Sequence, residues 1–145
     1  MKRTIVVAGL LAIGVSAAIA QSNVVEQRQG LMKEMAAQTR PIGAMLRGQE
    51  AFDLAKVQAS LKVFAESSQK AAPLFPESSK NAEKTEALPA IWENKAKFDA
   101  SMTKFTQDAQ AAMAAIKDEA SFKAEMPKVL QNCGGCHNDF RKKSS

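Results

Sequence analysis

Apolar residues recur every three or four positions over four long stretches of the chain, which is the spacing of an amphipathic helix. The spacing predicts helices over about 23–47, 53–70, 89–116 and 118–140, and no stretch alternates in the manner of a β-strand. The residues predicted to share one face of the first helix are Val24, Arg28, Leu31, Met32, Met35, Ile42 and Met45. This pattern predicts an all-α protein.

Helix-ending residues divide these stretches. Gly48 is suited to stop the first helix, Asp53 to cap the second, and Pro89 to open the third. Pro41 lies inside the first helix and should kink it, because proline has no amide hydrogen to donate. Residues 71–88 contain two prolines and a polar centre, so we expect a long loop there. Short turns within each helix pair favour an antiparallel up-down-up-down four-helix bundle.

The N-terminus has the form of a secretory signal peptide. Lys2 and Arg3 precede an apolar run over residues 5–20, which ends in the small-residue pattern Ala18-Ile19-Ala20. A membrane anchor is the alternative, but this run is shorter than the about 20 residues that a spanning helix needs. We therefore expect residues 1–20 to be cleaved before Gln21. The mature domain would comprise residues 21–145, have no membrane span and reside in the periplasm.

The charge of the mature domain is mildly positive. Cleavage would lower the count of lysine and arginine from 20 to 18 against 15 acidic residues, so the net charge falls from +5 to +3. The cations are scattered along the helices and not interleaved with aromatic residues in one strip. This distribution argues against nucleic-acid binding.

The segment Cys133-Gly134-Gly135-Cys136-His137 carries the candidate chemistry. The C-x-x-C-H spacing is the attachment signature of c-type haem. Two thiols three residues apart on a helix can each add to one vinyl group of a single porphyrin, and the next residue then brings an imidazole under the iron. Glycines between the cysteines leave room for the flat macrocycle. One covalently attached haem c with His137 as axial ligand is the resulting prediction.

A pair of cysteines can also serve three other purposes. A zinc site needs two further ligands, but these are the chain's only cysteines and its only histidine. A thiol oxidoreductase normally places its cysteine pair at a helix N-terminus, whereas this pair falls near a helix C-terminus. A disulfide would close almost no loop. Because there is one histidine, the second axial position is left to methionine, another donor, or nothing.

Bundle topology narrows the methionines that could reach the iron. The end of the fourth helix should lie beside the start of the first, which puts His137 level with Arg28, Met32 and Met35. Met126 is 11 residues earlier on the helix of His137, about 16 Å away. Three more methionines, which should lie too far along their helices, are Met45, Met102 and Met113. Met32 is the candidate ligand, the alternative being that Met32 and Met35 only contact the porphyrin.

The chain resembles the class II cytochromes c, the cytochrome c-prime family. The motifs that carry the resemblance are Gln27-Arg28 with Met32, Pro41 to Leu46, Leu74-Phe75-Pro76, Pro89 to Trp92, Lys97-Phe98-Asp99, Cys133 to His137 and Phe140-Arg141. The resemblance implies a left-handed four-helix bundle, often a homodimer, with His137 as the proximal ligand.

The family has two branches, and this chain has features of both. In one branch a methionine at the position of Met32 binds the iron and gives a low-spin electron carrier. In the other the iron is five-coordinate and high-spin and binds nitric oxide or carbon monoxide, and Arg28 is typical of that branch. There the residue like Arg28 lies near a haem propionate, and positions matching Gln29, Thr85 and Glu86 line the haem. A solvated charge in the first helical turn is the alternative for Arg28.

Outer-sphere electron transfer with redox partner proteins is the function that we expect, and not enzyme catalysis. Nothing in the sequence suggests a substrate pocket with acid and base groups. Residues 141–143 are all basic and follow the haem motif, so they could dock an acidic partner. The simpler alternative is that they complement the dipole at a helix C-terminus. Gas binding is the second hypothesis, and a thiol oxidoreductase without haem is the third.

Overall fold

The computed structural model describes residues 11–143, with side chains from residue 23 onward. Lys2, Arg3 and the first half of the predicted signal peptide lie outside the described residues. The long helices are α1 (Leu11–Leu46), α2 (Leu54–Ala71), α4 (Lys95–Ala115) and α5 (Glu119–Phe140). Between α2 and α4 lie the short 3-10 helix η1 (Glu77–Ser79) and the single turn α3 (Ala90–Glu93).

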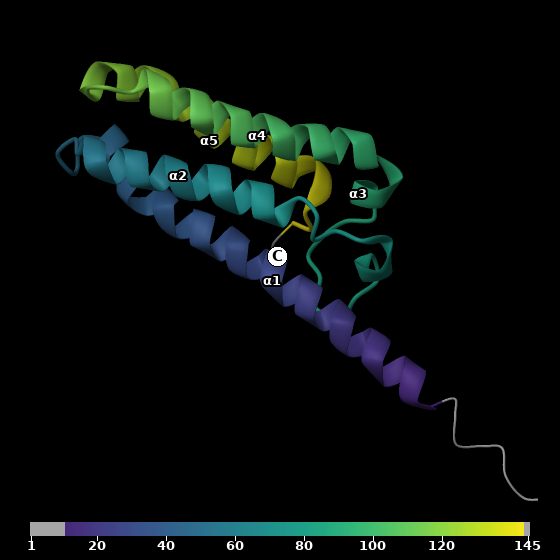
Figure 1. Cartoon of the computed structure of the whole chain (residues 1–145). Coiled ribbons are helices and arrows are strands. Elements are labelled where there is room, and N and C mark those ends of the chain that lie inside the picture. Colours follow the sequence, from purple (N-terminus) through teal and green to yellow (C-terminus); the bar gives the residue numbers. More distant parts are fainter. Residues whose placement is uncertain (1–10, 144–145) are drawn as a thin grey trace, which may run out of the picture.

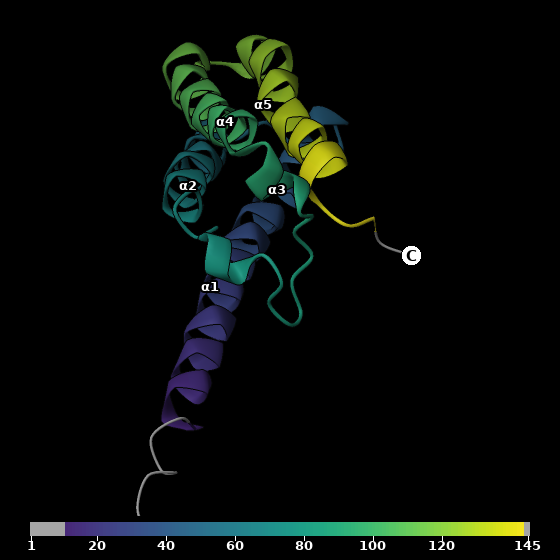
Figure 2. The ribbon, with the colours of Figure 1, turned by 90° about the vertical axis from the view of Figure 1, so that its right-hand side faces the viewer.

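The four long helices form an antiparallel bundle. Successive long helices run in opposite directions, and α5 ends next to the segment that carries α3, at the same end of the bundle as the end of α2 and level with the middle of α1 (Figure 1). A view turned by 90° shows the chain between α2 and α4 covering this same end of the bundle (Figure 2). Within residues 11–143 no β-strand forms, and the one bridge joins Ala87 to Arg141. The prediction of an all-α four-helix bundle is confirmed.

The predicted helix-end signals at Asp53 and Gly48 are confirmed, and a capping box adds a further one. Asp53 caps α2, and its carboxylate accepts a hydrogen bond from the backbone N of Lys56 at 3.1 Å. Asp118 and Ser121 form a reciprocal capping box at the start of α5. Gly48 follows α1 with a φ of +69°, a conformation that glycine adopts without strain.

Two helices differ from the prediction. α1 begins at Leu11 and not near Asn23, because residues 11–22 include four alanines, and alanine is the best helix former. The predicted third helix is split into α3 and α4 at Asn94, which has φ −125° and ψ 47°. Asparagine suits such a break, since its side chain competes with the backbone for hydrogen bonds.

The buried face of α1 is shifted by one residue at its start. Val25 is the fully buried residue there, not Val24. From Val25 the spacing to Arg28, Met32 and Met35 alternates three and four, so this face keeps a straight seam toward the bundle axis. Among the described residues, no helix is both long enough and apolar enough to span a bilayer.

Candidate haem site

A cavity of about 470 Å³ opens at the end of the bundle where α5 finishes. This volume lies within the range of about 300–1,000 Å³ that is common for small-molecule and cofactor pockets. Seven of the eight residues predicted for the site line the cavity: Arg28, Gln29 and Met32 from α1, Glu86 from the loop, and Cys133, Cys136 and His137 from α5. Thr85 does not line it.

The two cysteines lie half-buried in the last turns of α5 and form no disulfide. Burial raises the pKa of the Cys133 thiol. Burial also raises the pKa of Cys136 to about 11, with smaller contributions from the negative forms of Cys133 and Asp139. A redox-active cysteine pair needs a thiolate near neutral pH. Neutral thiols beside an apolar cavity suit addition to a porphyrin better than disulfide exchange.

His137 is half-buried one residue after Cys136. Burial, and the nearby charge of Arg141, lower the pKa of its imidazole, while Glu86 acts in the opposite direction. The imidazole is therefore neutral near pH 7, the form whose lone pair can bind a metal ion. No protein contact requires glycine at 134 or 135, because a Cβ added at either would meet no atom within 4 Å.

Arg28 shows that the cavity suits an anionic ligand. Its side chain is only 3% exposed, so the interpretation as a solvated charge is wrong. The guanidinium donates to Leu74 O at 3.1 Å, to Ser79 Oγ at 2.8 Å and to Thr85 Oγ1 at 2.6 Å, and it lies 4.7 Å from the centre of the Phe75 ring. Burial lowers its pKa. It has no carboxylate partner among residues 23–143.

An unpaired buried cation is costly, so an anion brought by the cavity's ligand would stabilise it. Haem carries two carboxylates on its propionate groups, and this arrangement fits one of them. Thr85 serves the site differently from the prediction: its hydroxyl accepts from Arg28 and from the backbone N of Ala87, and it holds Arg28 instead of lining the cavity.

Residues 84–88 form a strap that joins α1 to the end of α5. From the α1 side, Gln29 Nε2 donates to Lys84 O at 2.9 Å. From the α5 side, Lys142 N donates to Glu86 O at 2.8 Å and Lys142 Nζ to Thr85 O at 2.9 Å, while Leu88 N donates to Phe140 O at 2.9 Å. Sequence analysis missed the strap, because no local pattern reports pairing between distant segments.

Three methionines line the cavity, namely Met32, Met35 and Met102. The expectation that Met102 lies too far from the site is therefore wrong. Trp92 does not line the cavity, and its Nε1 donates to the carbonyls of Phe75 and Pro76 at 3.1 Å each.

Five aromatic side chains, which the helical spacing did not predict as a group, also line the cavity, and we call them the aromatic wall. Its members are Phe64, Phe75, Phe98, Phe105 and Phe140. Phe98 meets Phe75 edge-on with ring centres 4.6 Å apart and meets Phe140 edge-on at 5.4 Å. The wall is apolar and polarizable, as a porphyrin face requires, and it carries no acid or base.

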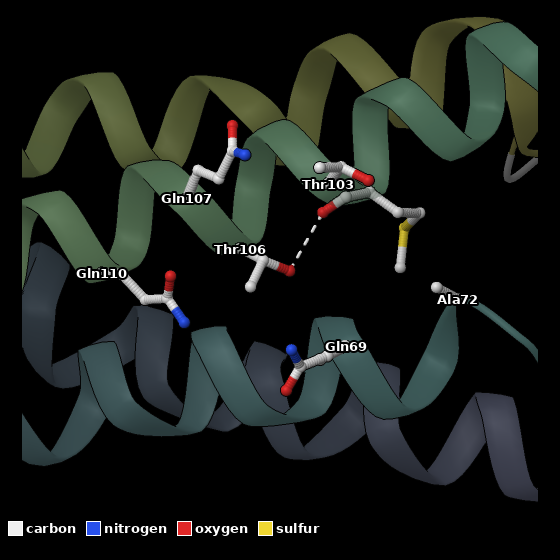
Figure 3. Close-up of a pocket in the computed structure, with 7 residues that line it drawn as sticks. Gln69, Ala72, Thr103, Thr106, Gln107 and Gln110 are labelled. Atoms are coloured by element: carbon white, nitrogen blue, oxygen red, sulfur yellow. Dashed lines mark hydrogen bonds between the residues drawn. The ribbon is translucent and has the colours of Figure 1, made fainter.

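A second hollow of about 270 Å³ lies between α2 and α4. Figure 3 shows its side chains projecting from both helices, and the hydroxyl of Thr106 donates to Met102 O at 3.1 Å. The residues that line it are Gln69, Ala72, Met102, Thr103, Thr106, Gln107 and Gln110. None of these is titratable, so the hollow offers no catalytic group. The described residues also hold no cluster of three or more His, Cys, Asp or Glu that could bind a metal ion.

The helical bundle and the C-x-x-C-H cavity define a c-type haem protein. The family model for cytochrome c' matches residues 23–141, and the chain belongs to that family. Its cofactor is accordingly covalently attached haem c. Cytochrome c' of Rhodopseudomonas palustris is 49% identical over 143 residues, which cover 99% of this chain and 98% of that protein. Cytochrome c-556 of the same organism is 37% identical over 147 residues, covering 99% of both.

Solved structures agree with the sequence comparison. The structure of cytochrome c' from Rhodopseudomonas palustris superimposes with a TM-score of 0.82 at 51% identity, covering 84% of this chain and 98% of that one. A structural model of oxidised cytochrome c556 from the same organism gives a TM-score of 0.77 at 34% identity, covering 86% and 99%. The chain is thus similar both to proteins named cytochrome c' and to proteins named cytochrome c-556.

Proposed function

We propose that this chain is a periplasmic electron carrier, with haem c joined to Cys133 and Cys136 and with His137 as the axial ligand of the iron. When bound, the haem supplies an iron that alternates between the ferrous and ferric states. One observation supports the proposal. Both thiols, the imidazole, the aromatic wall and the buried Arg28, which has no carboxylate partner among residues 23–143, all line the same cavity.

The chain's own residues would attach and shield the cofactor. Cys133 and Cys136 would fix the haem to α5, and the same helix holds His137 at the cavity. The aromatic wall excludes water, which favours the less charged ferrous state. Arg28 lies where it could balance a propionate. Glu86 is the one carboxylate among the residues that line the cavity.

Met32 is our candidate for the sixth ligand. It lines the cavity from α1, on the helix that faces α5 across the site. Methionine ligation would raise the reduction potential by favouring ferrous iron. A five-coordinate site that binds nitric oxide or carbon monoxide is the second candidate function. The observation that favours it is Arg28, which is typical of the gas-binding branch and is fully built into this site.

Export is the remaining part of the proposal. The family model begins to match at residue 23, two residues after the mature N-terminus that we expect at Gln21. Cleavage there would leave residues 21–145 as the haem domain. Haem attachment outside the cytoplasm fits the two cysteines, which an oxidising compartment would otherwise not leave idle.

Two measurements test the attachment. The protein would be produced in a host that exports it and attaches haem c. Its mass should equal that of residues 21–145 plus one haem, and the haem should remain attached in denaturing gels. A mass equal to the bare polypeptide would refute the proposal. The Cys133→Ser/Cys136→Ser variant provides the control, since it should lose the haem on denaturation.

The absorption spectrum decides between the two functions. If Met32 binds the iron, the parent protein is low-spin, and Met32→Ala turns it high-spin and lowers its potential. Met35→Ala is the matched control, because Met35 lines the same cavity three residues away, and it should stay low-spin. A parent that is already high-spin and binds carbon monoxide in the ferrous state would favour gas binding.

A further inference from the structure

The cations of this protein fall into two groups that differ in their partners. Residues 23–143 contain 18 lysines and arginines, which are the 20 of the whole chain without Lys2 and Arg3. Half of these form ion pairs with a carboxylate, and eight of those nine pairs lie within one helical turn. Paired charges of this kind have little field beyond their immediate surroundings.

The other half have no carboxylate partner among the described residues, and most of them gather at the cavity. Arg28, Lys33 and Arg141 line it. Lys84 and Lys142 belong to the strap and to the tail that is bonded to it. We call the more exposed members, Lys33, Lys84, Arg141 and Lys142, the cationic rim.

Hydrogen bonds explain why residues far apart in sequence form one rim. Gln29 binds the carbonyl of Lys84, which places Lys84 beside α1, one turn before Lys33. Lys142 binds the carbonyl of Thr85, and Arg141 bridges to Ala87, so the tail lies along the same strap. The strap therefore brings cations from α1, from the strap itself and from the C-terminal tail to the same side of the cavity.

The carboxylates nearby do not balance the rim. Three nearby carboxylates have other partners, because Glu77 pairs with Lys80, Asp139 pairs with Lys97, and Glu34 accepts a hydrogen bond from Ser67. Glu83 and Glu86 remain, and neither forms an ion pair within the described part of the chain. Four cations thus face two carboxylates. Like charges that lie close together repel one another and destabilise the folded state, so the rim is not explained by a contribution to stability. At the edge of an apolar cavity such charges project their field into the solvent.

We propose that the cationic rim is the docking surface for an acidic redox partner protein. The inference rests on the proposed electron-carrier function and adds the chemistry of the partner. Complementary charge accelerates encounter and orients the partner more than it adds affinity. Lys33 and Arg141 line the cavity, and Lys84 and Lys142 belong to the strap and tail beside it, so a partner held there would lie close to the cofactor. The Debye length of about 10 Å at 0.1 M salt makes such docking salt-sensitive.

Small redox ions probe the rim without a known partner. We would measure the rate at which hexacyanoferrate(III), an anion, oxidises the reduced haem protein as ionic strength increases. The variant Lys33→Glu/Lys84→Glu reverses two rim charges. The control Arg47→Glu/Lys117→Glu makes the same change of net charge near the two turns at the opposite end of the bundle (Figure 1).

The rim variant should react with hexacyanoferrate(III) about 10-fold more slowly at low salt, a difference that disappears at high salt. The control should change much less. Hexaammineruthenium(III), a cation, should react faster with the rim variant. Poly-L-glutamate, as a model acidic surface, should slow the parent and the control but not the rim variant.

Equal rates for the two variants, with a normal spectrum, would overturn the docking surface and leave the electron-carrier proposal intact. A rim variant with an altered haem spectrum would show that Lys33 or Lys84 serves the haem carboxylates instead, which also overturns it. Protection by phosphatidylglycerol vesicles but not by poly-L-glutamate would assign the rim to a membrane surface. A protein that cannot be reversibly reduced at all would refute the electron-carrier function itself.

Discussion

The two ends of the bundle use the same kinds of side chain in different ways. At the end formed by the α1–α2 and α4–α5 turns, which we call the packed end, apolar residues are fully buried: Val57, Leu61, Ile116, Phe122 and Met126 all have 0% exposure. At the cavity end, residues just as apolar line a space of about 470 Å³. The sequence spacing is helical and regular at both ends.

The difference shows where the protein relies on something other than its own chain. Protein interiors are normally packed as densely as organic crystals. The packed end meets that standard with side chains alone, as in the 5.5 Å approach of the Phe52 and Phe122 rings. At the cavity end Phe75, Phe98 and Phe105 all line the cavity, so part of each ring faces that space and not another side chain. We infer that the haem completes the core there.

The largest effect on stability should come from removing a buried ring at the packed end. Phe122→Ala removes a ring with no exposed surface, and it should lower the free energy of unfolding by about 3–5 kcal/mol. The haem spectrum should not change, because Phe122 does not line the cavity. Guanidinium titration followed by circular dichroism, together with the visible spectrum, measures both quantities.

Phe105→Ala is the matched substitution at the boundary of the cavity. Phe105 touches Phe64 with ring centres 5.8 Å apart and also lines the cavity. Its loss should therefore alter the haem spectrum, unlike that of Phe122. If Phe122→Ala altered the spectrum and Phe105→Ala did not, the division of the molecule into two ends would be wrong.

The second prediction concerns the support of the cavity end. Thr85→Val keeps the shape of the side chain but removes the hydroxyl that accepts from Arg28. A buried guanidinium donor left without a partner should cost about 1–3 kcal/mol. Thr103→Val, on the exposed side of α4, is the control and should stay within about 0.5 kcal/mol of the parent. Thermal unfolding of the haem-loaded protein tests the pair, and equal melting temperatures would contradict a supporting role for Thr85.

Features that depend on neighbouring residues were predictable from the sequence. The caps at Asp53 and Asp118 follow from side chains that reach the nearest backbone amides. The four-helix pattern follows from the spacing of apolar residues, and the C-x-x-C-H motif keeps its chemistry within five residues. Together these local features were sufficient to predict the fold class and the end of the bundle at which the haem is expected.

Features that depend on pairing across the fold were not predictable. Arg28 binds Thr85 from 57 positions away, and no periodicity reports this. The strap and the aromatic wall have the same origin. Met102 was misplaced for a geometric reason: it lies seven residues into α4, about 10 Å along the helix, and the cavity extends that far.

The third prediction uses the strained point of the strap. Lys84 has a φ of +63°, which is costly for a residue with a side chain. Lys84→Gly should remove that strain but make the unfolded chain more flexible, so the net gain should be about 0.5–1 kcal/mol. Lys80→Gly is the control, because Lys80 has a right-handed φ of −58°, and that substitution should destabilise the protein. Chemical denaturation measures both, and a loss of stability in Lys84→Gly would show that the strap is not strained there.

The smallest effect should come from the ion pair that joins α4 to α5 at the cavity end. Lys97 Nζ lies 2.8 Å from Asp139 Oδ2, but the two side chains are 65% and 47% exposed. Exposed pairs of this kind are screened by water and salt, so we expect a coupling free energy of about 0.5 kcal/mol or less. A double-mutant cycle with Lys97→Met and Asp139→Asn, repeated in 1 M salt, measures it. A coupling well above this value that also survived high salt would mean that surface charge helps to hold the cavity end together, and the haem would then not be the main element that completes its core.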